Sequence, residues 1–344
     1  MPPVSSMPSC RLADDFAARL LAWWDEHGRH DLPWQHPRTA YRVWVAEIML
    51  QQTQVSTVIH YYRPFLQRFP DLQTLACAGI DDIMSAWSGL GYYRRAVHMH
   101  RAAQLCMQLH KGALPTTAEA LLALPGIGRS TANAIISQSL DLPLPILDGN
   151  LKRVLARHAG IAGWPGERSV ERKLWLAAEL RLPQHRGADY AQACMDLGAT
   201  LCRRRQPRCG DCPVAGDCHA LQLSQQDELP GRRQRRAKTQ RQLQLLVYRR
   251  GDQILLQKRP AIGIWASMWS LPEGTADPRS AQAMQVIRHE LTHLQLHITP
   301  WLMPETAECM VADTPLQWYK LRESLQLGLP KPIRDIIAQL PEPD

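Results

Sequence analysis

Four cysteines crowd into residues 202–218, in the stretch CRRRQPRCGDCPVAGDC. Cys202, Cys209, Cys212 and Cys218 follow the spacing C-x6-C-x2-C-x5-C, which suits four thiolates bound to Zn²⁺ or to a [4Fe-4S] cluster. A zinc ribbon usually has two C-x2-C pairs and this segment has one, so the spacing favours iron–sulfur. The chain has nine cysteines, an odd number that argues against a disulfide framework.

The same segment is strongly basic. It contains Arg203, Arg204, Arg205 and Arg208, which a metal-clamped loop is expected to turn toward phosphate. The alternative is a solvated charge run. The whole chain of 344 residues has a formal net charge of +8, which favours a polyanionic partner and nucleic acid first.

A Gly-x-Gly hairpin lies between two apolar stretches in LPGIGRSTANAII, residues 124–136. Gly126 and Gly128 let a backbone come close to a partner, and the amides at the start of the following helix can bind a phosphate without reading bases. This pattern is typical of a helix-hairpin-helix. An ordinary tight turn between helices is the alternative.

Two carboxylates have neighbours that could tune them for proton transfer or charge stabilisation. Glu47 lies in the apolar stretch VWVAEIML, where burial raises the pKa of a carboxyl and makes it a proton donor near neutral pH. A glutamate on the exposed side of the helix fits the pattern equally well. Asp148, in PILDGNLKRVLARHAG, precedes a basic helix that is expected at a DNA-facing surface. It can cap that helix or face a group that becomes positive, and one carboxylate can do both.

The elements that must position these residues are helices. Residues 11–221 read as an all-α domain, with two helices in 40–69 and further ones at 81–88, 92–110, 117–124, 129–139, 150–159 and 168–179. A basic linker follows at 222–240. Residues 241–344 read as an α+β domain: QLQLLVYRRGDQILLQKRP predicts two strands joined by a Gly-Asp turn, LQLHITPWLM and LQWYKL predict further strands, and AQAMQVIRH (281–289) predicts a helix.

Nothing in the chain predicts contact with a membrane. It has no apolar run of about 18 residues, and the first 15 residues lack the apolar core of a signal peptide. We therefore expect a cytoplasmic, nucleoid-associated protein that acts as a monomer.

The hairpin, the Asp-Gly turn and the cysteine spacing together resemble the endonuclease III superfamily of helix-hairpin-helix DNA glycosylases. Within it, WVAEIMLQQTQV (44–55), GLGYYRRA (89–96) and LPGIGRSTA (124–132) resemble the MutY family. The resemblance is close over about residues 11–220 and looser in the tail. It implies an α-helical glycosylase domain with a [4Fe-4S] cluster loop, followed by an α+β Nudix-like domain.

The resemblance also implies an activity. Members of this family remove adenine mispaired with 8-oxoguanine, and less well with guanine, from double-stranded DNA after flipping the base out. Glu47 matches the catalytic glutamate that protonates adenine, and Asp148 matches the aspartate that stabilises the positive sugar. Bifunctional relatives carry a lysine where this chain has Ser130, so little or no strand cleavage is expected.

Further positions match residues that contact DNA or the target base. Trp34 in LPWQ matches the adenine pocket, Gln52 and Tyr92 match loops that probe the duplex, and Asn150 follows the Asp-Gly turn. In the tail, the family's Phe-Ser-His loop for the opposite lesion corresponds to Leu291, Thr292 and His293. The tail lacks the glutamate run that binds Mg²⁺ in Nudix hydrolases, so it is expected to bind and not to hydrolyse.

Two other functions remain open at this point. A bifunctional pyrimidine-lesion glycosylase of the endonuclease III type would share the helical domain, but Ser130 and the tail argue against it. A DNA-binding iron–sulfur protein without activity would use Glu47 and Asp148 only as structural residues.

Overall fold

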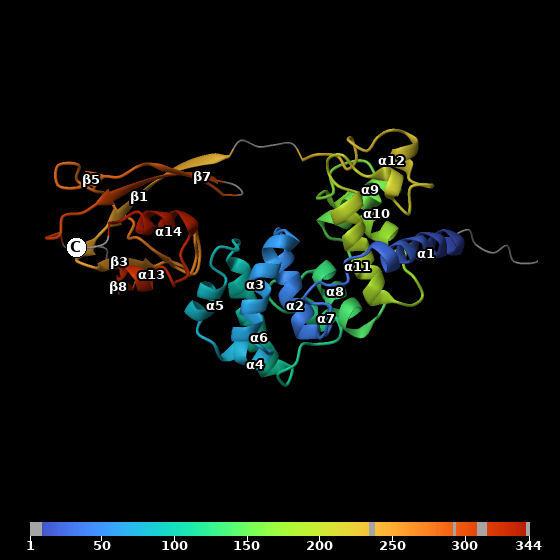
Figure 1. The fold of residues 1–344 in the computed structure, drawn as a ribbon, viewed down its shortest axis with the longest axis horizontal. Coiled ribbons are helices and arrows are strands. Elements are labelled where there is room, and N and C mark those ends of the chain that lie inside the picture. Colours follow the sequence, from blue (N-terminus) through green and yellow to red (C-terminus); the bar gives the residue numbers. More distant parts are fainter. Residues whose placement is uncertain (1–8, 234–237, 292–293, 308–314, 342–344) are drawn as a thin grey trace, which may run out of the picture. The chain divides into compact units, whose positions relative to one another are not determined.

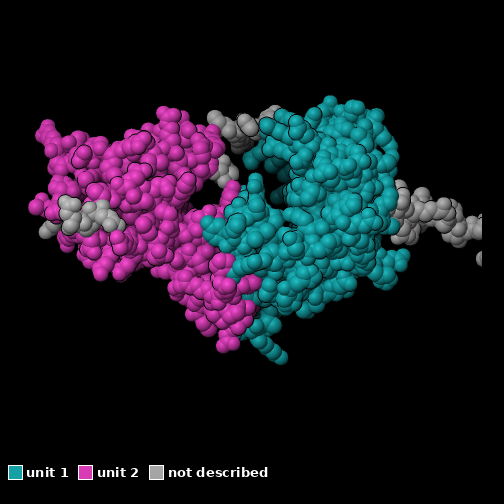
Figure 2. Space-filling model, in the orientation of Figure 1, with its two compact units in different colours: residues 1–63, 105–234 teal, residues 64–104, 235–344 magenta. Residues whose placement is uncertain are grey.

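The computed structural model describes residues 9–233, 238–291, 294–307 and 315–341. Each of its two compact units combines separate parts of the chain: residues 1–63 with 105–234, and residues 64–104 with 235–344 (Figure 2). Throughout residues 9–233 the structure contains helices and turns and no strand, which confirms the all-α prediction for this part. Among the helices of the described ranges, none is both long and apolar enough to cross a membrane.

The helical part follows the predicted pattern closely (Figure 1). Its elements are α1 (Ser9–His27), α2 (Ala40–Leu50), α3 (Val55–Arg68), α4 (Leu72–Cys77), α5 (Ile80–Ala86), α6 (Arg94–Leu109), α7 (Ala118–Leu122), α8 (Arg129–Leu140), α9 (Gly149–His158), α10 (Arg168–Glu179), α11 (Gly187–Asp196), the π-helix η1 (Leu197–Leu201), the 3-10 turn η2 (Cys209–Asp211) and α12 (His219–Gln222). The patterns did not predict α11, a helix of small and polar residues whose start is set by tertiary contacts.

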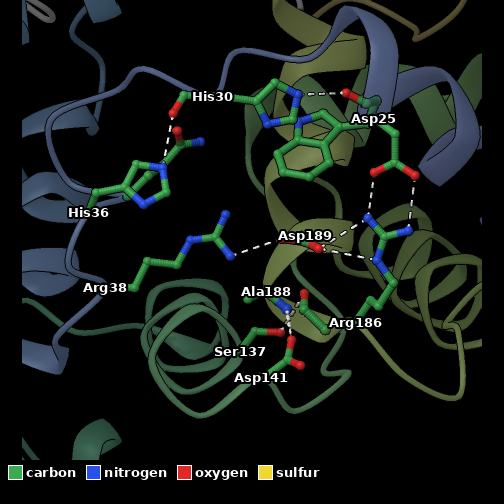
Figure 3. A network of polar contacts seen from close by, with 12 residues as sticks. Asp25, His30, His36, Arg38, Ser137, Asp141, Arg186, Ala188 and Asp189 are labelled. Carbon is green, nitrogen blue, oxygen red and sulfur yellow. Dashed lines mark hydrogen bonds and ion pairs between the residues drawn. The ribbon is translucent and has the colours of Figure 1, made fainter.

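Those contacts form a polar network at the first turn of α11 (Figure 3). Arg186, in the left-handed conformation, forms ion pairs with Asp25 at the end of α1 and with Asp189 on α11. Arg38 donates to the other oxygen of Asp189 over 2.9 Å. These side chains are partly exposed, so each pair adds little stability, but together they fix the loop 30–38 against α1 and α11.

The core of the first unit joins α1 to α9, α10 and α11. Phe16, Leu20 and Trp24 lie on one face of α1 and are buried. They pack with apolar residues such as Leu155 of α9 and Leu174 of α10. Burial of this stripe is what holds the helices that carry the site in place.

The C-terminal part forms two small sheets. Its elements are β1 (Thr239–Val247), β2 (Arg249–Arg250), β3 (Gln253–Lys258), β4 (Trp269–Ser270), β5 (Gln282–Ala283), β6 (Ile287–Glu290), β7 (Leu294–Leu302), β8 (Leu316–Lys320), α13 (Leu321–Ser324) and α14 (Lys331–Ala338). One sheet pairs β1 in parallel with β7, and β5 and β6 also pair with β7; the other pairs β3 with β2, β4 and β8. Apolar residues of β1, β3, β7 and α14 share one core.

One detail of the C-terminal prediction was wrong. The helix predicted over residues 281–289 is β5 and β6, because Ile287 aligns with Ile298 of β7 and the neighbouring strand overrides local preference. The strands joined by the Gly-Asp turn are present: β2 pairs with β3 across that turn, and β1 precedes β2 along the chain and pairs with β7 in the other sheet. The strands predicted in LQLHITPWLM and LQWYKL are confirmed as β7 and β8.

Candidate active site

A cavity of about 950 Å³ opens in the first unit, between α2, the starts of α8 and α9, and the α11–η1 segment. Several residues predicted to act in the site line it: Trp34, Glu47, Gln52, Ser130, Asp148 and Asn150. They come from four separate segments of the chain. The fold therefore brings together residues that the sequence predicted separately.

Glu47 projects from α2 into this cavity. Its helix neighbours Val45, Ala46 and Ile48 are buried, while Glu47 keeps access to solvent through the cavity that it lines. Protein surrounds its carboxyl on the other sides, and this burial is the main reason why its pKa is raised. The charge of Asp148 also raises the pKa and a hydrogen bond from Gln138 lowers it, and the net result is a pKa of about 7.

Gln138 was not foreseen. It is buried on α8, and its Nε2 donates to Glu47 Oε1 over 3.0 Å. An amide that donates to the carboxylate favours the charged form of Glu47 and holds the side chain in one orientation. A glutamine in a helical pattern carries no mark of this role, because the contact depends on how α2 and α8 pack.

Asp148 is the N-cap of α9, as the sequence predicted. Its Oδ1 accepts the Leu151 N–H over 2.7 Å. Burial raises the pKa of Asp148, while the Leu151 amide and the charges of Arg153 and Lys152 act in the opposite direction. The cap fixes the carboxyl at the positive end of a helix and at the wall of the cavity.

The basic residues that follow Asp148 do not form the open DNA-facing surface that the sequence led us to expect. Lys152 is paired with Glu171 at 2.6 Å. Arg153 Nε donates to the carbonyl of Cys202 over 2.8 Å, and Arg157 is buried. This helix face instead binds the cysteine loop, because each guanidinium finds backbone carbonyls there.

The cysteine loop encloses a second, small cavity. Cys202, Cys209, Cys212 and Cys218 all line it, and none of the four is in a disulfide. Apolar side chains such as Leu201 and Leu221 complete its walls. Within the described part of the chain, no group of three or more His, Cys, Asp or Glu side chains stands ready to hold a metal ion. The chemistry of the donor set, four free thiols around one largely apolar cavity, nevertheless fits a [4Fe-4S] cluster.

Arg157 braces this loop. Its guanidinium donates to the carbonyls of Leu229 and Arg203 over 3.0 and 2.7 Å, and to Cys202 Sγ over 3.4 Å. Arg157 is tied inward, whereas the other arginines of the loop, Arg203, Arg204, Arg205 and Arg208, are exposed. Arg203 and Arg204 also line the large cavity, so its wall carries positive charge as well as the two carboxyl groups.

The hairpin between α7 and α8 uses its two glycines differently. Gly126 has φ of +81°, a conformation that L side chains rarely adopt. Gly128 is the N-cap of α8 with ordinary backbone angles, and a Cβ added there would meet nothing within 4 Å. Nothing inside the described structure requires a glycine at position 128, so its open face is available to an external partner.

Three residues beneath the cavity were also missed. Asp196 is fully buried and accepts from Arg29 Nη2 over 2.6 Å and from Gln192 Nε2 over 2.8 Å. Because a carboxylate can only accept, it fixes the Gln192 amide with the nitrogen toward Asp196. Among the described residues, Gln192 Oε1 finds no hydrogen-bond donor although it is buried, and Gln192 lines the large cavity. All lie outside the helices that the patterns predicted.

Comparison with known proteins now adds to this geometry. The HhH-GPD superfamily of base excision DNA repair proteins matches residues 45–179, and the NUDIX domain family matches residues 244–339. An adenine DNA glycosylase of Buchnera aphidicola from Schizaphis graminum is 34% identical over 338 residues, covering 94% of this chain and 97% of the relative. The chain belongs to the adenine DNA glycosylases. The adenine DNA glycosylase of Mus musculus is 36% identical, and the matched region covers 80% of this chain and 64% of that relative.

Solved structures share the fold of the helical part of the chain. A thermostable thymine-DNA glycosylase is 25% identical, with a TM-score of 0.56, over 62% of this chain and 97% of its own. An endonuclease III–DNA complex has a TM-score of 0.52 at 17% identity, over 64% and 99% of the two chains, which indicates a shared fold. The predicted fold class, a helix-hairpin-helix glycosylase followed by a Nudix-like domain, is thus confirmed, and with it an N-glycosylase of base excision repair.

Ser130 has a structural contact in this glycosylase. Its Oγ accepts the Leu147 N–H over 2.9 Å, so the hydroxyl holds the chain directly before Asp148. Asn150 is similarly engaged and accepts from Arg153 Nη2 over 3.0 Å. Both side chains therefore support the position of Asp148 as well as lining the cavity.

The remaining predicted residues of the glycosylase are placed as follows. Trp34 is buried with its ring edge-on to Tyr62, so it belongs to the core as well as to the cavity wall. Gln52 is exposed in the turn after α2 with φ of +59°. Tyr92 belongs to the second unit and is exposed. Thr292 and His293 lie outside the described residues.

Proposed function

We propose that this glycosylase removes adenine opposite 8-oxoguanine, and less well opposite guanine, from double-stranded DNA. The observation that carries the proposal is the pair Glu47 and Asp148 on the wall of one cavity, with the pKa of Glu47 raised to about 7. Two carboxyl groups with different tasks can protonate a leaving group and stabilise the cation left behind.

Glu47 is the proton donor in this mechanism. With a pKa of about 7, close to half of the carboxyl groups hold a proton at neutral pH. Transfer of that proton to a ring nitrogen lets adenine leave as a neutral base. The hydrogen bond from Gln138 keeps the carboxyl aimed while the other oxygen is available to the substrate.

Asp148 stabilises the deoxyribose as the N-glycosidic bond breaks. The sugar then develops oxocarbenium character, and a fixed anion beside it lowers the energy of that state. Because the Leu151 amide already holds Asp148, the carboxylate needs no reorganisation at the moment of reaction.

Gln192 favours adenine over guanine as the base that the cavity binds. Its buried Oε1 needs a donor, and the exocyclic amino group of adenine is one, whereas guanine presents an acceptor at the equivalent position. Arg29 and Asp196 keep the Gln192 amide from turning over to accommodate the wrong base. A site with a fixed acceptor discriminates against a base that leaves that acceptor unpaired.

Water is the nucleophile in this proposal: its oxygen bonds to the anomeric carbon of the cationic sugar, and its proton passes to Glu47, which became a carboxylate when it protonated adenine. Position 130 is a serine, whose hydroxyl is held by Leu147 and cannot form a Schiff base. The enzyme is therefore monofunctional, with little or no strand cleavage.

The duplex must open for the adenine to reach the cavity. Base flipping leaves a gap in the stack, which the exposed Tyr92 fills, while Gln52 hydrogen-bonds the orphaned base edge. The NUDIX domain recognises the lesion opposite through Thr292 and His293. Phosphate contacts by the hairpin and the arginines of the cysteine loop hold the enzyme on the backbone, so binding weakens steeply with salt.

Cys202, Cys209, Cys212 and Cys218 hold a [4Fe-4S] cluster in this proposal. The cluster would cross-link the loop and stabilise its exposed arginines in one arrangement. No catalytic step passes through it, because Glu47 and Asp148 lie on the other cavity.

The test is excision from matched duplexes that carry adenine opposite 8-oxoguanine, guanine or thymine, and cytosine opposite 8-oxoguanine. We expect free adenine from the duplex with adenine opposite 8-oxoguanine, and less from the duplex with adenine opposite guanine. Neither adenine opposite thymine nor cytosine opposite 8-oxoguanine should be released. Borohydride should trap no covalent complex, whereas a lysine-containing endonuclease III serves as the positive control. Trapping of this protein, or release of a damaged pyrimidine in place of adenine, would overturn the proposal. DNA binding without release of any base would leave a non-enzymatic iron–sulfur protein.

A further inference from the structure

The second unit contains a short loop that is fastened on both sides. Residues 88–93, SGLGYY, connect α5 to α6 and carry the exposed Tyr92. We call them the wedge loop, since Tyr92 is the residue assigned above to the gap left by the flipped base. Tyr92 has φ of +50°, a strained conformation for an aromatic residue, which persists only where the surroundings impose it.

The helical side of the unit supplies the first set of contacts. Arg95 is buried, and its Nη2 donates to the carbonyl of Gly91 over 3.1 Å. Its guanidinium also lies over the rings of Tyr92 and Trp87, at 5.5 and 5.4 Å from their centroids. Trp87 Nε1 donates to the same Gly91 carbonyl over 3.1 Å. These contacts fix the backbone on either side of Tyr92.

The NUDIX domain supplies the second set. Arg334 of α14 donates through Nη2 to Ser88 Oγ over 2.8 Å, at the first residue of the wedge loop. At the last residue, the hydroxyl of Tyr93 accepts from Gly89 N over 3.1 Å and donates to the carbonyl of Leu329 over 3.4 Å. The loop is thus bonded at both ends to residues more than 200 positions later in the chain.

The NUDIX residues that bind the wedge loop, Arg334 and Leu329, are held by the core of their own domain. Arg334 also donates to the carbonyl of Leu325 over 2.6 Å, and its helix α14 buries Ile333 and Ile337 in the core shared by both sheets. Leu329 is itself part of that core and fully buried. A change in the NUDIX domain core therefore reaches the wedge loop through rigid, packed elements.

We propose that Ser88, Tyr93 and Arg334 are positioning residues through which the NUDIX domain sets the wedge loop in the conformation that presents Tyr92 to DNA. The inference rests on the proposed function and deepens it. Engagement of the NUDIX domain with the lesion strand and extrusion of the adenine are then coupled events. The residues touch neither the target base nor Glu47 and Asp148; they act through Tyr92.

The test uses the full chain and the double variant S88A/Y93F, which removes both hydroxyl anchors and leaves the bonds of Arg334 to Leu325 and Leu327. Ser85→Ala is the matched control, since Ser85 Oγ donates to the carbonyl of Gln326 between the same segments but outside the loop. Base extrusion is followed by the fluorescence of 2-aminopurine placed next to the target adenine, and excision by single-turnover release of adenine.

We expect S88A/Y93F to weaken the fluorescence rise and to slow excision about fivefold, a size typical of coupling through packed contacts. Ser85→Ala should leave both signals unchanged, and the thermal midpoints of all variants should agree closely. Tyr92→Ala should slow excision as well, and adding S88A/Y93F to it should slow it no further, because both changes act through the same side chain.

Two results would overturn the inference. One is a fluorescence rise in S88A/Y93F equal to that of the wild type. The other is a triple variant whose excision rate is lowered by the product of the separate effects of S88A/Y93F and Tyr92→Ala. Absence of adenine release by the wild-type protein would instead refute the proposed function. The 2-aminopurine fluorescence of the wild type and S88A/Y93F would still show whether the anchors affect base extrusion.

Discussion

Gln138 Nε2 lies 3.0 Å from Glu47 Oε1, across 91 positions of the chain. The hydrogen bond joins α8 to α2 and opposes the effect of burial, which disfavours the charged carboxyl. Its net result is a pKa of about 7 in a cavity that also contains Asp148. The buried amide of Gln138 thus keeps the pKa of Glu47 from rising higher, so that both protonation states of Glu47 are populated at neutral pH.

The first prediction concerns the pH dependence of excision. Glu47 must be protonated to act as an acid, so the single-turnover rate should fall as the pH rises above about 7. Glu47→Gln should remove this alkaline limb and lower the rate by about 10²–10⁴-fold. A rate in Glu47→Gln equal to that of the wild type would remove Glu47 from the mechanism.

The second prediction tests the role of Gln138. Gln138→Leu keeps the volume but removes the donor that favours the carboxylate, so the pKa of Glu47 should rise and the alkaline limb should move to higher pH, by about one unit. Ser139→Ala, on the same helix but bonded to Ile135, is the control and should leave the profile in place. A shift to lower pH in Gln138→Leu would contradict the sign derived from the contact.

The helical domain could be predicted from the sequence because its patterns are local. Apolar spacing and capping residues mark most helices to within a few positions, and the cap that the sequence allows at Asp148 is present, since its carboxyl accepts the Leu151 N–H. The predicted boundaries of the domains and the linker, at 221 and 240, stay a prediction.

Contacts between distant segments could not be predicted in this way. The pattern of Glu47 was ambiguous between burial and exposure, and its partner Gln138 depends on helix packing. The prediction for Arg153 and Arg157 was wrong because the sequence of a basic helix face is the same whether it meets phosphate or backbone carbonyls of its own chain. The strands at 282–290 were missed because β7 supplies their pairing.

The third prediction separates the two glycines of the hairpin. Gly126→Ala should destabilise the protein by about 1 kcal/mol, because alanine disfavours φ of +81°. Gly128→Ala should change the free energy of unfolding by less than about 0.5 kcal/mol, since its Cβ meets open space, yet should weaken DNA binding. Urea unfolding and DNA titration measure the two effects, and unchanged DNA affinity in Gly128→Ala would exclude close approach of the backbone there.

The fourth prediction concerns the arginines of α9 and the cysteine loop. Arg157→Ala should destabilise the protein by about 3 kcal/mol, because it removes a buried side chain and leaves the carbonyls of Leu229 and Arg203 without their donor. Arg205→Ala removes an exposed charge, so the free energy of unfolding should stay the same while the salt dependence of DNA binding weakens. The reverse pattern would show that Arg157, and not Arg205, faces the DNA.

The most direct test of the central claim is the single-turnover rate of adenine release opposite 8-oxoguanine by the wild type and by Asp148→Asn. Asparagine can still accept the Leu151 N–H and cap α9, so the fold should persist while the negative charge is lost. We predict a rate at least about 100-fold lower, as for loss of a preorganised charge at a developing cation. An equal rate in a folded Asp148→Asn protein would contradict the mechanism and leave Asp148 as a helix cap.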